Sequence, residues 1–381
     1  MYVQLFIFLL IYWRLLGPVV HYKGTLSADL SRKNNIIFIM ILFIIQSGFR
    51  HLAIGADTFT YYEMFEEVKN MKWNEIISSF FDFIYTDEGK DPGYLILQKI
   101  FASVIPNYRL FLIGVAALFF TALGQLLYKY THSNKEILVA VALYQCLYYS
   151  FMSITGIRQT IAASFLLFAI PYILGKKWMK GILLILIAAT QHKSALLFSG
   201  FIILPYIQNS RLLLMFAFLG FIPMMNWGSQ IAEYFMVGTR FEQYSNYLNE
   251  YEGAGAYGFM VFILLLSIGL YIQNKRLCKM NAYNYVYINA IAVALFLTPL
   301  TMINPSNMRV IQYYSIFALI MLPKLCTIYS DRVNFDLYKI IFWIFAVYTI
   351  FFRHVEYAFF WQEMQLGPQY SFQGHFYDFS L

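Results

Sequence analysis

Long apolar stretches separated by short polar ones run along almost the whole chain. A helix that crosses the hydrocarbon core of a membrane needs about 20 mostly apolar residues. By this measure the pattern predicts about twelve membrane-crossing helices, near residues 2–20, 35–49, 107–128, 137–154, 157–175, 180–193, 194–208, 212–227, 257–273, 285–303, 308–325 and 338–353. The region 180–208 fits either two short spans or one longer helix that breaks near His192. A further apolar stretch, 92–105, predicts an interfacial or re-entrant helix before the third span.

Composition narrows the class of protein. Hydrophobic residues make up 60% of the 381 residues and charged residues only 12%, whereas about 25% of the residues of a soluble protein are charged. We therefore expect an all-α polytopic membrane protein, with 1–381 as a single integral membrane domain. Neither a metal nor another cofactor is predicted, because the three cysteines lack metal-binding spacing and the acidic pair Asp87 and Asp91 is too loosely spaced.

The basic residues are distributed as they are in the loops of membrane proteins. Their clusters, in 23–33, 129–135, 176–180, 275–279 and 324–339, all fall on one face of a bundle with about twelve spans, and the positive-inside rule makes this face cytoplasmic. The net charge of +7 thus follows from topology and does not indicate nucleic-acid binding. The outer face would carry two amphipathic loops rich in acidic and aromatic residues, 50–93 and 228–256.

Single arginines at the outer ends of the helices run against this rule. They are Arg50, Arg158, Arg240, Arg309 and Arg353. A cation near the membrane interior is costly, so an acidic side chain or an anionic ligand must offset the cost. The planar guanidinium group presents paired N–H donors that match phosphate oxygens. The pattern favours an outward-facing anion site, although each arginine could instead pair with a carboxylate or anchor a helix end.

Four polar groups from separate parts of the chain are expected to meet in one outward-facing pocket. Arg158 begins a helix that descends to a basic turn, and the following helix returns to His192. Arg309 begins another descending helix, and Asp57 lies just outside the second span. Each group also has a purely structural interpretation, since His192 could bond a backbone carbonyl in a turn and Asp57 could close an Asx-turn.

Short motifs of the chain, in a fixed order, resemble those of a known family. They are Gly55, Asp57, Thr58 and Tyr61; Gly-Ile-Arg-Gln at 156–159; His-Lys-Ser-Ala-Leu at 192–196; Asn307, Arg309 and Tyr313; and Pro368, Tyr370 and Phe372. Together they resemble the EpsG family of Wzy-type polysaccharide polymerases over most of the chain. One departure is Ala56, where the family more often has threonine or a similar residue before the aspartate.

The resemblance implies a GT-C-like membrane glycosyltransferase that needs neither a nucleotide sugar nor a cofactor. Such polymerases transfer a growing glycan from undecaprenyl pyrophosphate to a new lipid-linked repeat unit at the outer leaflet of the bacterial plasma membrane. The product would be O-antigen, capsule or exopolysaccharide. A chain-length regulator and a flippase would be the partner proteins.

On this hypothesis the candidate residues take distinct roles. Arg158 and Arg309 would bind the pyrophosphate, with Arg240 as a third contact, and would stabilise the charge that develops on the leaving group. His192 would remove the proton of the acceptor hydroxyl or orient the phosphate, and Asp57 is the competing base. A single displacement would invert the anomeric carbon. Further substrate-binding candidates are Gln159, Lys193, Arg50 and Tyr61.

Three other functions remain open at this point. A flippase for lipid-linked oligosaccharides would also have arginines in a helical bundle, but such transporters usually show two similar halves, and no internal repeat is evident. An O-acyltransferase would need an acyl donor, whose path usually reaches the cytoplasmic side. An O-antigen ligase would share the donor chemistry, but its dominant outer loop typically lies between late spans, whereas here the larger loop is early.

Overall fold

The computed structural model describes residues 2–16, 25–55, 57–86, 91–236, 256–330, 336–352 and 357–362. Over these ranges the structure is helical, and its one extended pairing is an isolated bridge between Arg50 and Phe359. The α-helices are α1 (Tyr2–Leu16), α2 (Thr25–Gly48), α3 (Thr58–Asn70), α4 (Trp73–Thr86), α5 (Pro92–Val104), α6 (Tyr108–Tyr130), α7 (Asn134–Leu143), α8 (Ile157–Leu174), α9 (Trp178–Gln191), α10 (Ser210–Met236), α11 (Tyr257–Met280), α12 (Asn284–Leu297), α13 (Leu300–Ile303), α14 (Met308–Ser315), α15 (Ala318–Ser330) and α16 (Leu337–Phe351).

Several of these helices can cross a membrane. Five described segments are long and apolar enough, namely Asp29–Gly48, Tyr108–Tyr130, Ile157–Leu174, Ser210–Tyr234 and Tyr257–Met280. The pair Pro305–Ser315 and Ala318–Ser330, which is bent by 62°, would make a sixth span. Shorter apolar helices occupy most of the other expected positions, and the expected span 137–154 is formed by α7 and two π-helical segments, Tyr144–Tyr148 and Ser150–Thr155. The prediction of a helical, multi-pass membrane protein is therefore confirmed, while the total of about twelve crossings stays a prediction.

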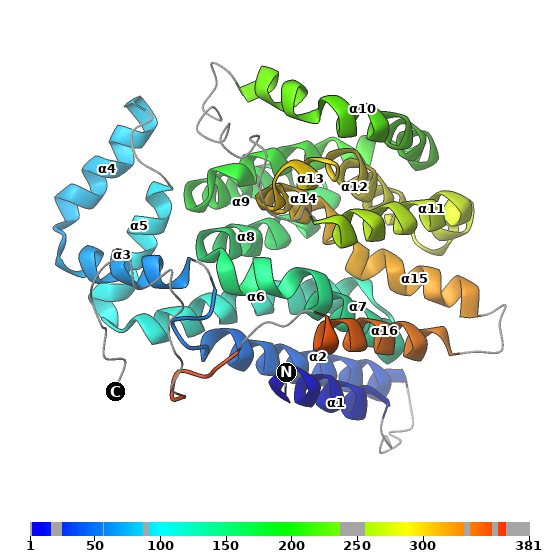
Figure 1. Ribbon diagram of the computed structural model, residues 1–381, viewed down its shortest axis with the longest axis horizontal. Helices are drawn as coiled ribbons and strands as arrows, with labels where there is room; N and C mark the ends of the chain where they lie inside the picture. The colour runs from blue at the N-terminus through cyan, green and yellow to red at the C-terminus, as the bar shows by residue number, and fades with distance from the viewer. Residues whose placement is uncertain are drawn as a thin grey trace.

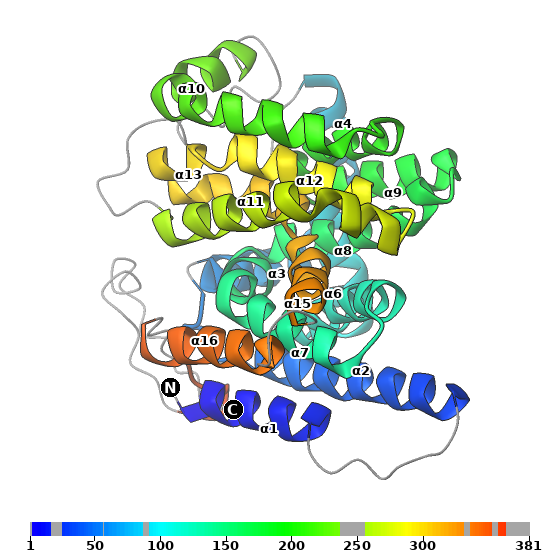
Figure 2. The ribbon, with the colours of Figure 1, turned by 90° about the vertical axis from the view of Figure 1, so that its right-hand side faces the viewer.

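The helices lie side by side in a bundle, with α1 and α2 at one edge and α10 at the other (Figures 1 and 2). Near the centre, every α7 side chain from Glu136 to Leu143 is buried. At the edge, α10 exposes large apolar side chains such as Leu219 and Ile222. A helix that is apolar on all sides requires protein or lipid around it, so the pattern fits a core helix in α7 and a lipid-facing helix in α10.

The region 180–208 forms two short antiparallel segments. Helix α9 ends at Gln191, and a 3-10 helix, Lys193–Ile202, begins directly after His192. The chain then returns to the start of α9, because the ring of Tyr206 stacks on the ring of Trp178 with 5.7 Å between their centroids. Of the two interpretations that the sequence allows, the structure therefore has two short segments and no single longer helix, and the chain reverses direction at His192.

Helices α3, α4 and α5 pack together at one end of the bundle, and we call them the cap (Figure 1). The buried Lys99 of α5 donates from Nζ to the carbonyl oxygens of Val68, Lys69 and Met71, at 3.2, 3.0 and 2.6 Å. These bonds satisfy carbonyl groups that a helix leaves unpaired at its C-terminal end. The expected outer loop 50–93 is thus largely helical, and α3 is fastened to α5.

The second expected outer loop, 228–256, begins later in the structure than in the sequence interpretation. Helix α10 continues as far as Met236. Its exposed side includes the aromatic residue Tyr234, which lies beyond the apolar run 212–227 used to place the span. The remainder of this loop, 237–255, lies outside the described residues.

Candidate functional site

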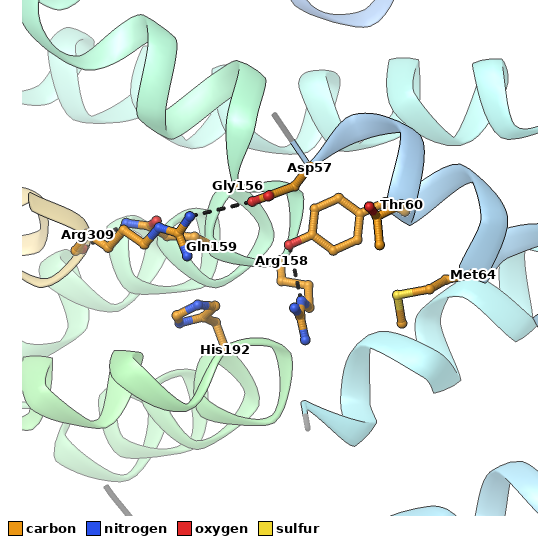
Figure 3. A pocket seen from close by; sticks show the side chains of 9 residues that line it. Asp57, Thr60, Met64, Gly156, Arg158, Gln159, His192 and Arg309 are labelled. Atoms are coloured by element: carbon orange, nitrogen blue, oxygen red, sulfur yellow. Dashed lines mark hydrogen bonds and ion pairs between the residues drawn. The ribbon is translucent and has the colours of Figure 1, made fainter. Parts of the chain in front are cut away.

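A polar pocket lies where the cap meets the ends of three bundle elements (Figure 3). Its cavity has a volume of about 190 Å³. The residues that line it are Asp57, Thr60, Tyr61 and Met64 from the α3 region, Gly156, Arg158 and Gln159 from the start of α8, His192 from the end of α9, and Arg309 from α14. The structure therefore brings together the four groups that the sequence places at one depth of the membrane, and adds two more candidates, Tyr61 and Gln159.

Three helices begin at this pocket. Asp57 precedes α3, Gly156 precedes α8, and Arg309 is the second residue of α14. The N-terminal end of a helix carries a partial positive charge. Two arginine side chains from these ends reach the same cavity, so the pocket is electropositive and suited to an anion.

The turn before α3 requires glycine. Gly55 has φ +94°, and a Cβ on it would lie 2.9 Å from the carbonyl oxygen of Ile154. The side chain of Thr58 donates from Oγ1 to the carbonyl oxygen of Ile54 at 2.7 Å, which closes the turn. A side chain at position 55 would push this turn away from residue 154. Glycine thus lets the chain bring Asp57 against the segment that leads into α8.

Asp57 faces Arg309 across the pocket. Its carboxylate makes no capping hydrogen bond to α3, and its Oδ2 lies 3.5 Å from Nη2 of Arg309 (Figure 3). The backbone carbonyl of Arg309 accepts a hydrogen bond from Nε2 of Gln159 at 2.7 Å, which ties α14 to α8. The Asx-turn interpretation of Asp57 therefore gives way to a long ion pair between Asp57 of the cap region and Arg309 of the bundle.

Arg158 is held more closely than Arg309. Its Nη1 lies 2.8 Å from Oδ2 of Asp91, and its Nε donates to the hydroxyl oxygen of Tyr61 at 3.2 Å. The guanidinium carbon also lies 5.3 Å from the centroid of the Tyr61 ring. Burial raises the pKa of Tyr61, despite the opposing influence of Arg158. The phenol therefore stays neutral, accepts from Arg158 and keeps its own proton.

His192 sits at the joint between α9 and the following 3-10 helix. Its Nδ1 lies 2.6 Å from Oγ of Ser194, and that hydroxyl lies 3.3 Å from the hydroxyl of Tyr313. The imidazole is buried, yet it is one of the groups that line the cavity. Because Ser194 engages Nδ1, the ring is held in a fixed orientation, and Nε2 is the nitrogen that a ligand could meet.

Two predicted residues lie away from the cavity. Lys193 is buried, and its Nζ lies 5.5 Å from the centroid of the Phe83 ring on α4. Arg50 donates from Nη1 to the carbonyl oxygen of Ser47 at 2.5 Å and from Nη2 to that of Ile154 at 3.1 Å. Neither lines the pocket. Three further predictions, Arg240, Arg353 and the tail motif at 368–372, lie outside the described residues.

Asp91 is a residue of this region that sequence reasoning missed. It lies behind Arg158, and its Oδ1 accepts a hydrogen bond from the backbone N–H of Lys193 at 3.0 Å. The sequence Asp-Pro-Gly at 91–93 is a signal for it, because aspartate before a proline is typical of a helix start. That signal predicts the start of α5 but does not identify the arginine that the carboxylate reaches.

No group of three or more His, Cys, Asp or Glu side chains that could hold a metal ion occurs within the described parts of the chain. The pocket contributes one imidazole and one carboxylate, together with two guanidinium groups. Positively charged side chains repel a metal cation and attract an anion. The chemistry of the lining therefore favours an anionic ligand.

Comparison with known proteins identifies one family. The model of the EpsG family matches residues 34–366, a range that includes every residue of the pocket. No curated protein and no solved structure matches the chain. The family match covers far more than half of the chain and leaves out α1, the start of α2 and the tail motif at 368–372.

Proposed function

The chain belongs to the EpsG family of Wzy-type polysaccharide polymerases, and from that premise we propose that it polymerises undecaprenyl-pyrophosphate-linked oligosaccharide repeat units. The observation that carries this proposal is the electropositive pocket, in which Arg158, Arg309 and the starts of three helices surround one cavity beside His192. A pyrophosphate is the group in such a reaction that needs this concentration of positive charge.

The donor would bind with its pyrophosphate between the two arginines. Arg158 keeps its contacts to Asp91 and Tyr61, so it presents a fixed guanidinium group. Within the described parts of the chain, the guanidinium group of Arg309 is held by one long contact to Asp57, which a phosphate oxygen can replace. As the bond between the anomeric carbon and the pyrophosphate oxygen breaks, negative charge grows on the leaving group, and the arginines stabilise it without reorganising.

The acceptor hydroxyl would attack the anomeric carbon from the opposite side. Its oxygen forms the new glycosidic bond, its proton passes to a base, and the electron pair of the old bond leaves on the pyrophosphate, so the configuration inverts. His192 is our leading candidate for the base. Its Nδ1 is engaged by Ser194, so Nε2 is the nitrogen available to the acceptor, and a pyrophosphate bound between Arg158 and Arg309 would offset their charge and stabilise the imidazolium that forms.

Asp57 is the competing base. While Arg309 pairs with it, the carboxylate is neutralised. Once a phosphate takes its place on Arg309, Asp57 would be free beside the acceptor. Proton transfer is therefore assigned to His192, and the exchange of partners on Arg309 to Asp57.

The pocket would face the outer leaflet of the bacterial plasma membrane. The basic clusters would then lie on the cytoplasmic face of a GT-C-like bundle with about twelve crossings, and the cap would cover the bound glycan. Lipid-linked repeat units would arrive through a flippase, and a chain-length regulator would act on the product, which is an O-antigen, a capsule or an exopolysaccharide.

The test uses purified protein in nanodiscs, supplied with undecaprenyl-pyrophosphate-linked repeat units and with no nucleotide sugar, metal or ATP. We expect a ladder on a gel whose bands differ by one repeat unit. The ladder should disappear in Arg158→Ala. The ladder should persist in Arg211→Ala. Arg211 does not line the pocket, and its guanidinium carbon lies 4.7 Å from the centroid of the Tyr271 ring.

Absence of a ladder from folded wild-type protein would contradict the proposal. Movement of the same lipid-linked oligosaccharide across a vesicle membrane would then assign the chain to the flippases. Transfer to a different acceptor, with no repeat-unit ladder, would assign it to the ligases.

A further inference from the structure

The carboxylate of Asp91 joins two parts of the pocket that are otherwise far apart in the chain. One oxygen, Oδ2, lies 2.8 Å from Nη1 of Arg158, at the start of α8. The other, Oδ1, accepts the backbone N–H of Lys193 at 3.0 Å, directly after His192. A single rigid group thus contacts both the arginine and the residue next to the histidine.

The backbone around Asp91 is tightly constrained. Asp91 has φ 50°, a left-handed conformation that is uncommon for any residue except glycine, asparagine or aspartate. Two residues later, a Cβ on Gly93 would lie 2.2 Å from Oγ1 of Thr190 and 2.6 Å from Nε2 of Gln191. The start of α5 is therefore pressed against the end of α9, and this close approach determines where the carboxylate of Asp91 lies.

We propose that Asp91 is the positioning residue of the active site, with one carboxylate that sets both the orientation of Arg158 and its separation from His192. This inference rests on the proposed function, in which Arg158 binds the donor pyrophosphate and His192 takes the proton of the acceptor. Asp91 does not line the cavity, so it acts through these two residues and makes no contact of its own with the substrate.

The carboxylate also sets the charge that the donor meets. While Asp91 pairs with Arg158, it offsets the positive charge of the guanidinium. Replacement by asparagine keeps the size of the side chain but removes its negative charge. The new amide group must also point an N–H donor at one of two donors, either Arg158 or the Lys193 backbone, so one of the two contacts is lost.

Asp91→Asn should therefore lower the polymerisation rate and raise the affinity for undecaprenyl pyrophosphate. The polymerisation rate should fall by about 10- to 100-fold, because small misplacements of reacting groups are costly. The affinity for undecaprenyl pyrophosphate should rise by about twofold to fivefold, because the negative charge of Asp91 no longer offsets the positive charge that Arg158 presents to the ligand. A residue needed only for folding would lower both quantities together.

The experiment measures initial ladder rates and, separately, the thermal shift that undecaprenyl pyrophosphate causes in each variant in nanodiscs. Asp91→Glu is the companion variant, since it keeps the charge and moves the carboxylate. We expect wild-type affinity but a reduced rate from it. Asp336→Asn is the matched control, because it removes a carboxylate that pairs with Lys135 at 3.1 Å, away from the pocket, and it should change neither quantity.

Parallel losses of rate and affinity in Asp91→Asn, or no change in either, would overturn the role of Asp91. If wild-type protein forms no ladder while Asp91→Asn still binds undecaprenyl pyrophosphate more tightly, the proposed polymerisation fails and the electrostatic role of Asp91 stands. If wild-type protein forms no ladder and Asp91→Asn binds undecaprenyl pyrophosphate with unchanged affinity, the proposed polymerisation and the role of Asp91 are both excluded.

Discussion

Two aspartate–arginine pairs adjoin the same pocket and differ in how firmly they are held. In both, the aspartate directly precedes a cap helix and the arginine is the second residue of a bundle helix. The Asp91–Arg158 contact is 2.8 Å and the Asp91 side chain is 6% exposed. The Asp57–Arg309 contact is 3.5 Å and the Asp57 side chain is 37% exposed.

This difference shows that the same pair of residue types can serve two purposes. Separating a buried pair leaves an uncompensated charge in a poorly solvated place, which is costly. Separating a partly exposed pair costs little, because water replaces the lost contact. Asp91–Arg158 is therefore suited to hold a position, and Asp57–Arg309 is suited to open and admit a phosphate.

The largest effect is expected from Arg158. Arg158→Ala should lower the ladder rate by about 10³-fold, as the loss of a charge-stabilising donor does in other enzymes. Arg158→Lys keeps the charge but not the planar fork, and it should still lose about 10²-fold. Arg309→Lys, in the loosely held pair, should lose less than Arg158→Lys. Near-normal activity of Arg158→Lys would show that a fixed guanidinium group is not needed.

A smaller effect is expected from Asp57→Asn. The rate should fall by about tenfold, and the KM for the donor should decrease, because Arg309 no longer has a competing carboxylate. His192→Ala is the comparator, and it should lose at least about a hundredfold. If Asp57→Asn loses more than His192→Ala while its KM for the donor is unchanged, Asp57 is the base and the two roles must be exchanged.

Unfolding free energies test the comparison without reference to activity. Asp91→Ala should destabilise the protein by about 3 kcal/mol, since it leaves Arg158 without its partner in a largely buried site. Asp57→Ala should cost less than about 1 kcal/mol. Chemical unfolding in detergent, followed by tryptophan fluorescence, measures both. Equal losses would mean that the two pairs are equally important for folding and that burial does not distinguish them.

Much of the site could be predicted from the sequence because topology alone determines which residues share a depth. Arg158, His192 and Arg309 lie at the ends of apolar runs, so alternating directions of the helices return them to one face. Asp57, in a glycine-containing turn after the second span, reaches the same pocket. The break at His192 was visible as a polar interruption of an apolar run, although the sequence left open whether the chain reverses there.

The partners of these residues could not be predicted, because they depend on how closely separate helices approach. Asp91 reaches Arg158 only because Gly93 allows α5 to pack against Thr190. Arg50 turns its guanidinium to the carbonyls of Ser47 and Ile154, a contact that no local pattern indicates. The direction of a side chain at a helix end thus depends on tertiary packing, which the hydrophobic periodicity of the sequence does not predict.

The smallest effect is expected from Lys193, and it sharpens the same comparison. Its contact with Asp91 uses the backbone N–H, which every residue but proline keeps. Its Nζ lies over the Phe83 ring of the cap and does not line the cavity. Lys193→Gln should therefore leave the KM for the donor within about twofold of wild type, since the backbone contact to Asp91 survives and the ammonium group does not line the cavity. Kinetics at several donor concentrations would measure it, and a KM raised tenfold would place the lysine ammonium on the pyrophosphate, because only contact with the charged donor gives so selective an effect.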